Sequence, residues 1–470
     1  MSSRVIVALA ATSFLSWPVH AAEADELAAI RQEIEQLKAT YDERIKALEA
    51  RLQALQQRPP EGGGQAARES PPAIGNASPV EPVAAASATG SASAFNPAIS
   101  LILAGTYANL SRDPSQYRLQ GFVPSGESGP GLRGFSLGES ELTLAASVDP
   151  TFSGRLTASI TADNQVEVEE ALFERQGLFE GATLRGGRFL SSIGYLNAQH
   201  AHTWDFVDAP LAYRAFFGGP TTTDGLHLHW LAPTERYLEL GAEIGAGRGF
   251  PGSESRRNGI GSGALMAHVG DDIGESASWR AGLSYVLNRA TDRAFADIRA
   301  DGTAVVNSFT GNSRTWIADA IYKWAPGGNA TRTSLKLQGE YFRRTESGTL
   351  TQDAAAAAAS GAYRSTQSGW YLQAVYQFMP QWRAGLRYDR LDSGTPRIDG
   401  VSNGALAAAD FPILASARPS RTTAMVDYSL SEFSRLRLQI AADRSNPAAT
   451  DRQLYLQYIM SLGAHGAHSF

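Results

Sequence analysis

The sequence predicts an all-β chain, a transmembrane antiparallel β-barrel of about sixteen strands preceded by an α-helical coiled coil. Three observations predict this class. From residue 98 onward, apolar and polar residues alternate with a period of two. The connections between the alternating runs are short at one end of the sheet and mostly long at the other. The polar face of the runs is rich in arginine and carboxylate side chains, which must be solvated by water.

Residues 1–22 have the pattern of a secretory signal peptide. Arg4 supplies the positive start, residues 5–15 form an apolar run too short to span a bilayer, and Ala21 and Ala22 provide small residues at the cleavage position. A buried N-terminal helix is the alternative. No later apolar run approaches the roughly 20 residues that a membrane helix needs. We therefore expect an exported protein without helical membrane spans.

Residues 23–57 predict a coiled coil. Apolar residues recur in steps of three and four from Leu27 to Leu55, with one extra four-residue step between Tyr41 and Ile45. Such a narrow stripe needs a partner helix, so self-association is the simplest interpretation, and a marginal lone helix is the alternative. Pro59 and Pro60 end the helix. Residues 58–94 are mostly Pro, Gly, Ala, Ser and Glu, and predict a disordered linker.

Residues 95–470 carry the barrel. In the run 435–440, arginine and glutamine alternate with leucine and isoleucine, and the run 454–462 has the same period. A β-sandwich has no reason to separate long loops from tight turns, whereas a membrane barrel does. Aromatic residues near the strand ends predict interfacial girdles: Trp316, Trp324, Trp370, Phe378 and Tyr428. Long connections are expected at 111–136, 191–223, 248–262, 290–313, 345–366 and 393–420.

The polar parity of the runs predicts which side chains line an aqueous bore. An interior of this kind follows from sixteen strands, which leave room for water. The residues expected to face it are His227, His229, Glu239, Glu243, His268, Arg280, Arg383, Arg387, Arg435 and Arg437.

The connection 191–223 is rich in Trp, Phe, Tyr and Leu. Outside the barrel these side chains would form an unusually large exposed apolar patch, so we expect the loop to fold inward and constrict the bore. The alternative is that its aromatics pack the outer loops together. The residues expected at the constriction are His200, His202, Trp204, Asp205, Asp208, Tyr213 and Arg214.

The histidines raise the question of a metal. His200, His202 and Asp205 offer nitrogen and oxygen ligands suited to zinc. The alternative is that the histidines are hydrogen-bonding groups of the bore. No other cofactor is expected.

The mature chain, residues 23–470, resembles the trimeric porins with an N-terminal periplasmic coiled coil, and more broadly the phosphate- and carbohydrate-type porins. The segment from Gly187 to Phe189 and on through residues 199–208 is similar to a bacterial outer-membrane family often labelled zinc-regulated or receptor-like. Terminal Phe470 resembles the signal by which such barrels are assembled. The resemblance implies a homotrimer with three pores in the outer membrane, its coiled coil in the periplasm.

These patterns together predict a porin for small hydrophilic solutes, embedded in outer-membrane lipid. A receptor-like uptake barrel for zinc or a metal complex, and a structural envelope protein, are the alternatives. The chain shows no Gly-rich phosphate loop, no Gly-x-Ser-x-Gly elbow and no His-Glu-x-x-His motif, so we expect no enzyme. The net charge of −6 argues against binding to nucleic acid.

Overall fold

The computed structural model describes residues 97–463, except 124, 126–127, 163, 254–257, 300, 355–358, 401–405 and 448. The expected signal peptide, coiled coil and linker, and the terminal Phe470, lie outside the described residues. No helix in the described part of the chain is long and apolar enough to cross a membrane.

The described chain is almost entirely β-structure, with one short helix, α2 (Leu211–Phe216), and a few single 3-10 turns. The strands are β1 (Ala98–Leu110), β2 (Gly134–Leu137), β3 (Ser140–Asp149), β4 (Phe152–Ile160), β5 (Val166–Gln176), β6 (Ala182–Leu190), β7 (Thr222–Leu231), β8 (Tyr237–Gly245), β9 (Ser262–Ile273), β10 (Ala277–Ile298), β11 (Ala304–Trp324), β12 (Ser334–Gln352), β13 (Ala359–Met379), β14 (Trp382–Asp392), β15 (Arg397–Ile398), β16 (Ser420–Ser431), β17 (Ser434–Asp443) and β18 (Asp451–Gly463).

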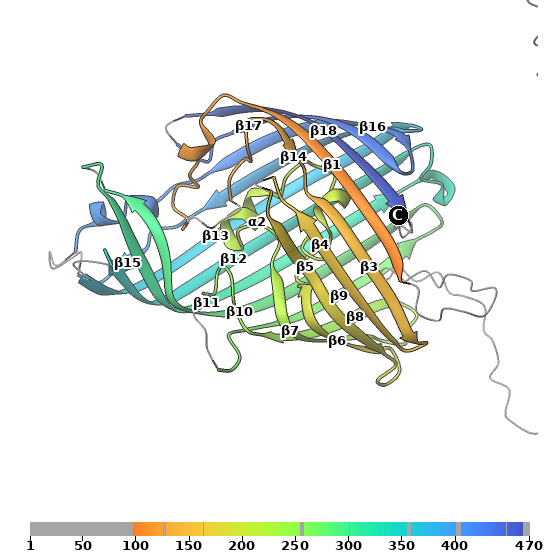
Figure 1. The fold of residues 1–470 in the computed structure, drawn as a ribbon, viewed down its shortest axis with the longest axis horizontal. Helices are drawn as coiled ribbons and strands as arrows, with labels where there is room; N and C mark the ends of the chain where they lie inside the picture. Colours follow the sequence, from red (N-terminus) through yellow and green to blue (C-terminus); the bar gives the residue numbers. More distant parts are fainter. Residues whose placement is uncertain are drawn as a thin grey trace, which may run out of the picture. The chain divides into compact units, whose positions relative to one another are not determined.

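The strands form one closed antiparallel barrel (Figure 1). Each strand of the wall pairs with the next along the chain, and β1 pairs with β18 over eleven residue pairs to close the ring. Of the eighteen strand segments in the sheet, β2 prolongs the line of β3 along β1, and β15 prolongs the line of β14 along β13. The wall therefore has sixteen strands, which confirms the predicted fold class.

The barrel is polar inside and apolar outside. On β14, Leu386 is 64% exposed on the outer face, whereas Arg387, the next residue, is 2% exposed inside. On β17 the same alternation places Leu438 outside and Arg437 and Gln439 inside. This reversal of the usual arrangement is stable only where lipid covers the outer face. Trp316, one of the residues expected in the aromatic girdles, is exposed on the outer face of the barrel.

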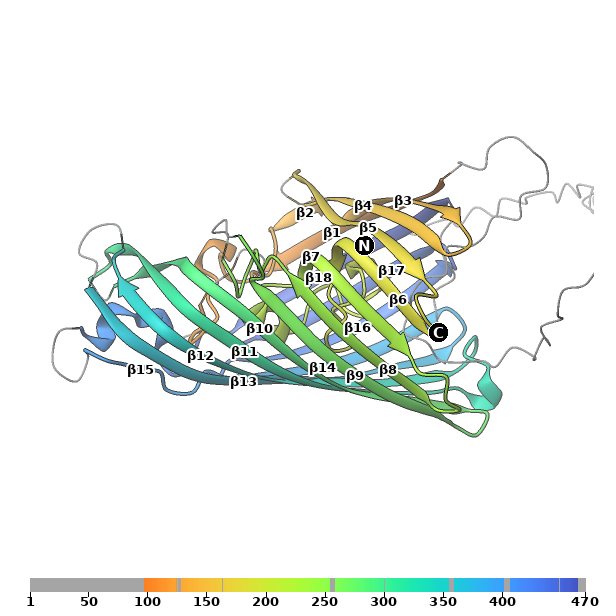
Figure 2. The same cartoon turned by 90° about the horizontal axis from the view of Figure 1, so that it is seen from below.

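Four strands, β10 to β13, are longer than the sequence predicts (Figure 2). The prediction of long loops at 290–313 and 345–366 is wrong, because most of the described residues in these ranges continue the strands. In these prolongations the pattern reverses. Phe295, Phe309 and Leu350 point inward and are buried with Leu414 of the connection between β15 and β16. A strand whose outer face meets water lacks the apolar outer row that marks the membrane-spanning runs.

Candidate functional site at the inner loop

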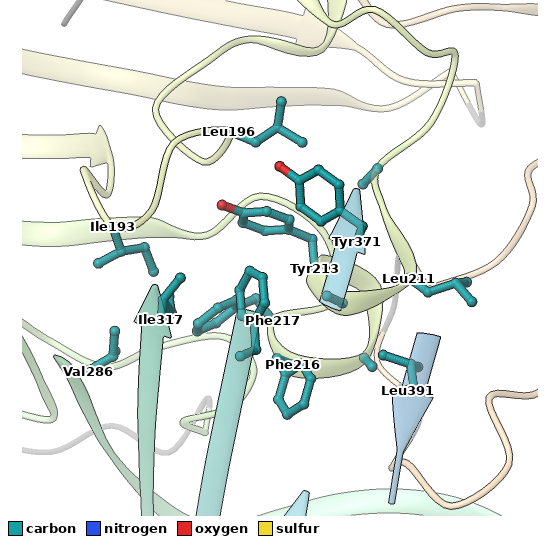
Figure 3. Close-up of a cluster of buried hydrophobic side chains, with 14 of the residues drawn as sticks. Ile193, Leu196, Leu211, Tyr213, Phe216, Phe217, Val286, Ile317, Tyr371 and Leu391 are labelled. Carbon is teal, nitrogen blue, oxygen red and sulfur yellow. The ribbon is translucent and has the colours of Figure 1, made fainter. Parts of the chain in front are cut away.

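Residues 191–221, which join β6 to β7, are named the inner loop. The apolar side of this loop packs against the inner wall of the barrel (Figure 3). Phe216 of α2 stacks on Phe342 of β12 with ring centroids 5.7 Å apart, and Tyr213 meets the same ring edge-on at 5.1 Å. These side chains are almost fully buried. The aromatics that make an outward loop implausible are therefore buried inside the barrel.

The two ends of the inner loop are tied to each other and to β8. Glu243 of β8 accepts hydrogen bonds from the Ser191 hydroxyl at 2.6 Å and from the Ser192 amide at 2.8 Å. Asn197 donates its side-chain amide to the carbonyls of Ser191 and Thr221. These hydrogen bonds fix the two ends of the inner loop where β6 ends and β7 begins.

Glu340 of β12 anchors the middle of the inner loop. Its carboxylate accepts the backbone amides of Tyr195 at 3.2 Å and Leu196 at 3.1 Å. It also accepts the phenol groups of Tyr213 at 2.9 Å and Tyr371 at 2.5 Å. Because this carboxylate is buried, four donors are what keep it satisfied away from water.

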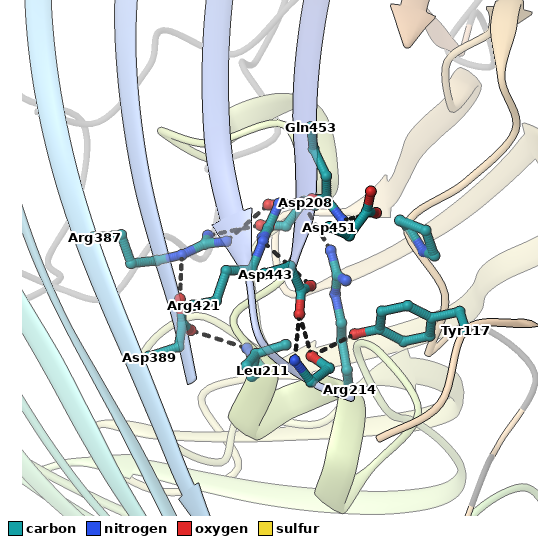
Figure 4. Close-up of polar contacts among 12 residues, drawn as sticks. Tyr117, Asp208, Leu211, Arg214, Arg387, Asp389, Arg421, Asp443, Asp451 and Gln453 are labelled. Carbon is teal, nitrogen blue, oxygen red and sulfur yellow. Dashed lines mark hydrogen bonds and ion pairs between the residues drawn. The ribbon is translucent and has the colours of Figure 1, made fainter. Parts of the chain in front are cut away.

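Asp208 joins the inner loop to a wall of guanidinium groups (Figure 4). Its carboxylate lies 2.6 Å from Arg421 of β16 and 2.7 Å from both Arg387 of β14 and Arg214 of α2. Burial would raise the pKa of the Asp208 carboxyl, but Arg421, Arg214 and Arg387 together hold that pKa well below its usual range. The loop is therefore clamped by one carboxylate shared among three cations.

Asp205 makes a second contact with cations nearby. It lies 2.5 Å from Lys336 and 3.6 Å from Arg383, and it accepts the Gln373 side-chain amide at 3.0 Å. Guanidinium groups of β17 also hold the loop backbone. Arg435 donates to the carbonyl of His202 at 2.7 Å, and Arg437 to that of Trp204 at 2.8 Å.

The histidine end of the inner loop meets carboxylates instead. His200 Nδ1 lies 2.9 Å from Glu169 and 3.3 Å from Glu141, and its Nε2 lies 3.3 Å from Glu170. His202 Nδ1 lies 2.8 Å from Glu141. Burial would lower the pKa of His200, but the carboxylates of Glu141, Glu169 and Glu170 raise it well above its usual value.

The remaining histidines predicted to face the bore lie on the inner face further around the barrel. Glu239 lies 2.9 Å from His229 and 3.1 Å from His268. His268 and Arg280 both face Asp319 of β11, at 3.8 and 3.5 Å. His227 is buried, and its ring stacks on Phe189 at 5.7 Å.

The structure separates the residues predicted on the inner loop, β14 and β17 into an acidic side and a basic side. His200 and His202 lie together at the acidic side, with their rings stacked 5.8 Å apart. Asp205 forms ion pairs with Lys336 and Arg383, not with the histidines. The three residues predicted to bind zinc are therefore not brought together at one point. The arginines of β14 and β17 lie at the basic side, with Asp427 between Arg383 at 2.5 Å and Arg437 at 2.8 Å.

Several residues that matter here are not among those predicted. The alternation of polar and apolar residues could have identified Glu340, Asp427 and Arg421, because each takes the polar position of an alternating strand. Glu169 and Glu170 do not follow parity. The strand pairing slips by one residue beside them, so that both face the same histidine.

Fold and site together define a class: a closed sixteen-strand barrel with an apolar outer face, whose polar interior holds one long inward loop. No known family model matches the chain. An uncharacterized protein of Aquifex aeolicus (strain VF5) is 30% identical over 404 residues, which is 80% of each chain. The chain therefore belongs to the same family as that Aquifex protein.

Solved structures of outer-membrane proteins are similar to this chain at low sequence identity. A loop L8 deletion mutant of OmpT of Vibrio cholerae has a TM-score of 0.48 at 10% identity, covering 78% of this chain and 99% of that one. The outer membrane channel DcaP of Acinetobacter baumannii gives 0.45 at 10% identity, over 78% and 97%. An anion-selective porin from Comamonas acidovorans gives 0.44 at 11% identity, over 78% and 99%. TM-scores of this size do not assign the chain to a fold or a function, so the fold class rests on the strand pairing described above.

Proposed function

We propose that the protein is an outer-membrane porin, through which small hydrophilic solutes diffuse passively past the inner loop. One observation carries the proposal: a sixteen-strand barrel keeps its charged side chains inside and its apolar side chains outside. A soluble barrel of this width would have the opposite arrangement, with an apolar core and a polar surface. Lipid outside and water inside satisfy both faces.

The inner loop is the proposed constriction. Its apolar side packs against the inner faces of β9 to β14, and a small pocket of about 30 Å³ lies beside Ile193, Phe217 and Val286. That volume holds about one water molecule. Solutes would therefore pass on the polar side of the loop, where His200, His202, Asp205 and Asp208 lie.

The charge distribution at the constriction is uneven. Guanidinium groups gather on β14, β16 and β17, whereas the carboxylates of Glu141, Glu169 and Glu170 gather on β3 and β5. Such a separation produces a field across the passage that orients dipolar and zwitterionic solutes. We further propose a homotrimer, joined through residues 23–57 in the periplasm and through the barrel walls.

Conductance in planar lipid bilayers tests the proposal. The purified full-length chain should open in steps, grouped in threes if the trimer is correct, and proteoliposomes should swell in small sugars and stop swelling as the sugar grows. A barrel that stays closed in both assays would contradict the channel. It would favour a receptor-like uptake barrel or a structural envelope protein instead.

A further inference from the structure

A β-bulge on β5 brings two consecutive carboxylates to the same point inside the barrel. Thr157 of β4 pairs with Glu170, and the next residue, Ala158, pairs with Val168, so Glu169 is the extra residue. In a regular strand Glu169 and Glu170 would face opposite sides of the wall. The bulge turns both toward His200, and bulges commonly redirect side chains in this way beside functional sites.

Three ligand atoms converge there. His200 Nδ1 lies 2.9 Å from Glu169 Oε2 and 3.3 Å from Glu141 Oε2, and one atom from each residue falls within 4.8 Å of the others. Ligands about 2.1 Å from a tetrahedral cation lie roughly 3.4 Å from one another. The existing separations therefore suit a small cation with only slight movement of the side chains.

The groups around these three atoms have the arrangement found behind metal ligands. The other ring nitrogen of His200 lies 3.3 Å from Glu170, and Glu141 is held by His202 at 2.8 Å. A histidine ligand that gives its second N–H to a carboxylate is the usual pattern in metal sites.

The charge of this cluster is not balanced by arginine or lysine. Among the described residues, Glu141 and Glu169 form ion pairs only with histidines. Arg155 reaches Glu170 instead, at 3.4 Å. In addition, Glu169 Oε1 is buried without a hydrogen-bond partner. A buried carboxylate oxygen in this state is costly unless a cation satisfies it.

We propose that Glu141, Glu169 and His200 bind a divalent transition-metal cation of the zinc class. One imidazole nitrogen and two carboxylate oxygens suit zinc, whereas magnesium and calcium prefer oxygen ligands throughout. A cation bound there links β3 and β5 to the inner loop and offsets the excess negative charge. The inference is independent of whether solutes pass through the barrel.

Metal titration of the folded full-length chain in detergent tests the site. After removal of metals with EDTA, cobalt(II) absorption and zinc competition should show one tight site per chain, with magnesium and calcium far weaker. Glu169→Gln should weaken zinc binding by at least about 100-fold, and Glu170→Gln, which alters only a supporting group, by about 10-fold. Both substitutions keep the size of the side chain.

Glu174→Gln is the matched control, because Glu174 lies on the same strand but pairs with Arg185 at 3.1 Å. It should bind zinc like the unaltered chain, and heat-dependent gel migration should show that every variant keeps its barrel. Equal zinc affinity in Glu169→Gln and the unaltered chain would overturn the site, as would the absence of binding. Loss of binding in Glu239→Gln with retention in Glu169→Gln would also overturn it. Since binding is measured without conduction, failure of the channel proposal is a separate result.

Discussion

The polar part of the inner loop, residues 200–208, is held by opposite charges at its two ends, called here the histidine end (His200) and the aspartate end (Asp205 and Asp208). At the aspartate end, Asp208 alone has three guanidinium partners, and Asp205 has a lysine and an arginine. At the histidine end, Glu141, Glu169 and Glu170 surround His200. One end therefore has more cations than anions, and the other has the reverse.

This difference in charge gives the two ends different roles: the aspartate end holds the loop in place, and the histidine end can bind a cation. Asp208 and Asp205 each lie between two or more cations, so that end is a clamp with little affinity for a further cation. Among the described residues of the histidine end, Glu141 and Glu169 form ion pairs only with histidines, and so this end retains affinity for a cation. The two charged walls would also attract opposite ends of a dipolar solute.

Breaking the clamp should have the largest effect. Asp208→Ala leaves Arg214, Arg387 and Arg421 buried without their shared partner, which should lower the free energy of unfolding by about 3–5 kcal/mol. It should also free the loop and raise single-channel conductance. Urea unfolding and bilayer recording measure the two effects. Unchanged conductance with lowered stability would show that the loop does not constrict the passage.

The clamp should also resist acid. Because the folded pKa of Asp208 lies well below its usual range, its contribution to stability is present above the unfolded pKa and is lost only as the pH falls through the folded pKa. Between pH 7 and pH 5 we therefore expect no loss of stability from this group. Stability of the unaltered chain minus that of Asp208→Ala, followed against pH, isolates the contribution; a decline already above pH 5 would contradict the clamp.

The middle anchor gives an intermediate effect. Tyr213→Phe removes one of the phenol donors of the buried Glu340 carboxylate but keeps the ring packing on Phe342. Loss of a hydrogen-bond donor from this buried acceptor should cost about 1–3 kcal/mol. Urea unfolding should show this loss without the rise in conductance expected for Asp208→Ala. A conductance rise of the same size would mean that Glu340, not the clamp, fixes the loop.

The sequence predicts the clamp better than the binding end. Arg437 and Arg387 are identifiable from parity because β14 and β17 alternate without interruption across the membrane. Glu169 is not, because a bulge breaks the parity that such reasoning needs. The prediction of β10 to β13 fails for a related reason: in the prolonged parts of these strands the apolar side chains face inward, so the outward apolar alternation ends.

The histidine end should be the less costly one to alter. His202→Gln removes the imidazole beside Glu141 but leaves a side-chain amide that donates a hydrogen bond. Measured with EDTA present, the free energy of unfolding should fall by only about 1 kcal/mol. A loss as large as that of Asp208→Ala would mean that both ends clamp the loop equally, and the contrast between them would be wrong.

The smallest effect sets the scale for the others. Asp392 pairs with Arg418 at 3.0 Å, but both side chains are largely in solvent, at 42% and 70% exposure. Exposed pairs of this kind contribute about 0–1 kcal/mol, because water and salt screen them. Asp392→Asn should therefore leave urea unfolding and conductance nearly unchanged. An effect comparable to Asp208→Ala would show that removing any aspartate from the charged network disturbs the barrel, and that burial among three guanidinium groups is not what makes Asp208 a clamp.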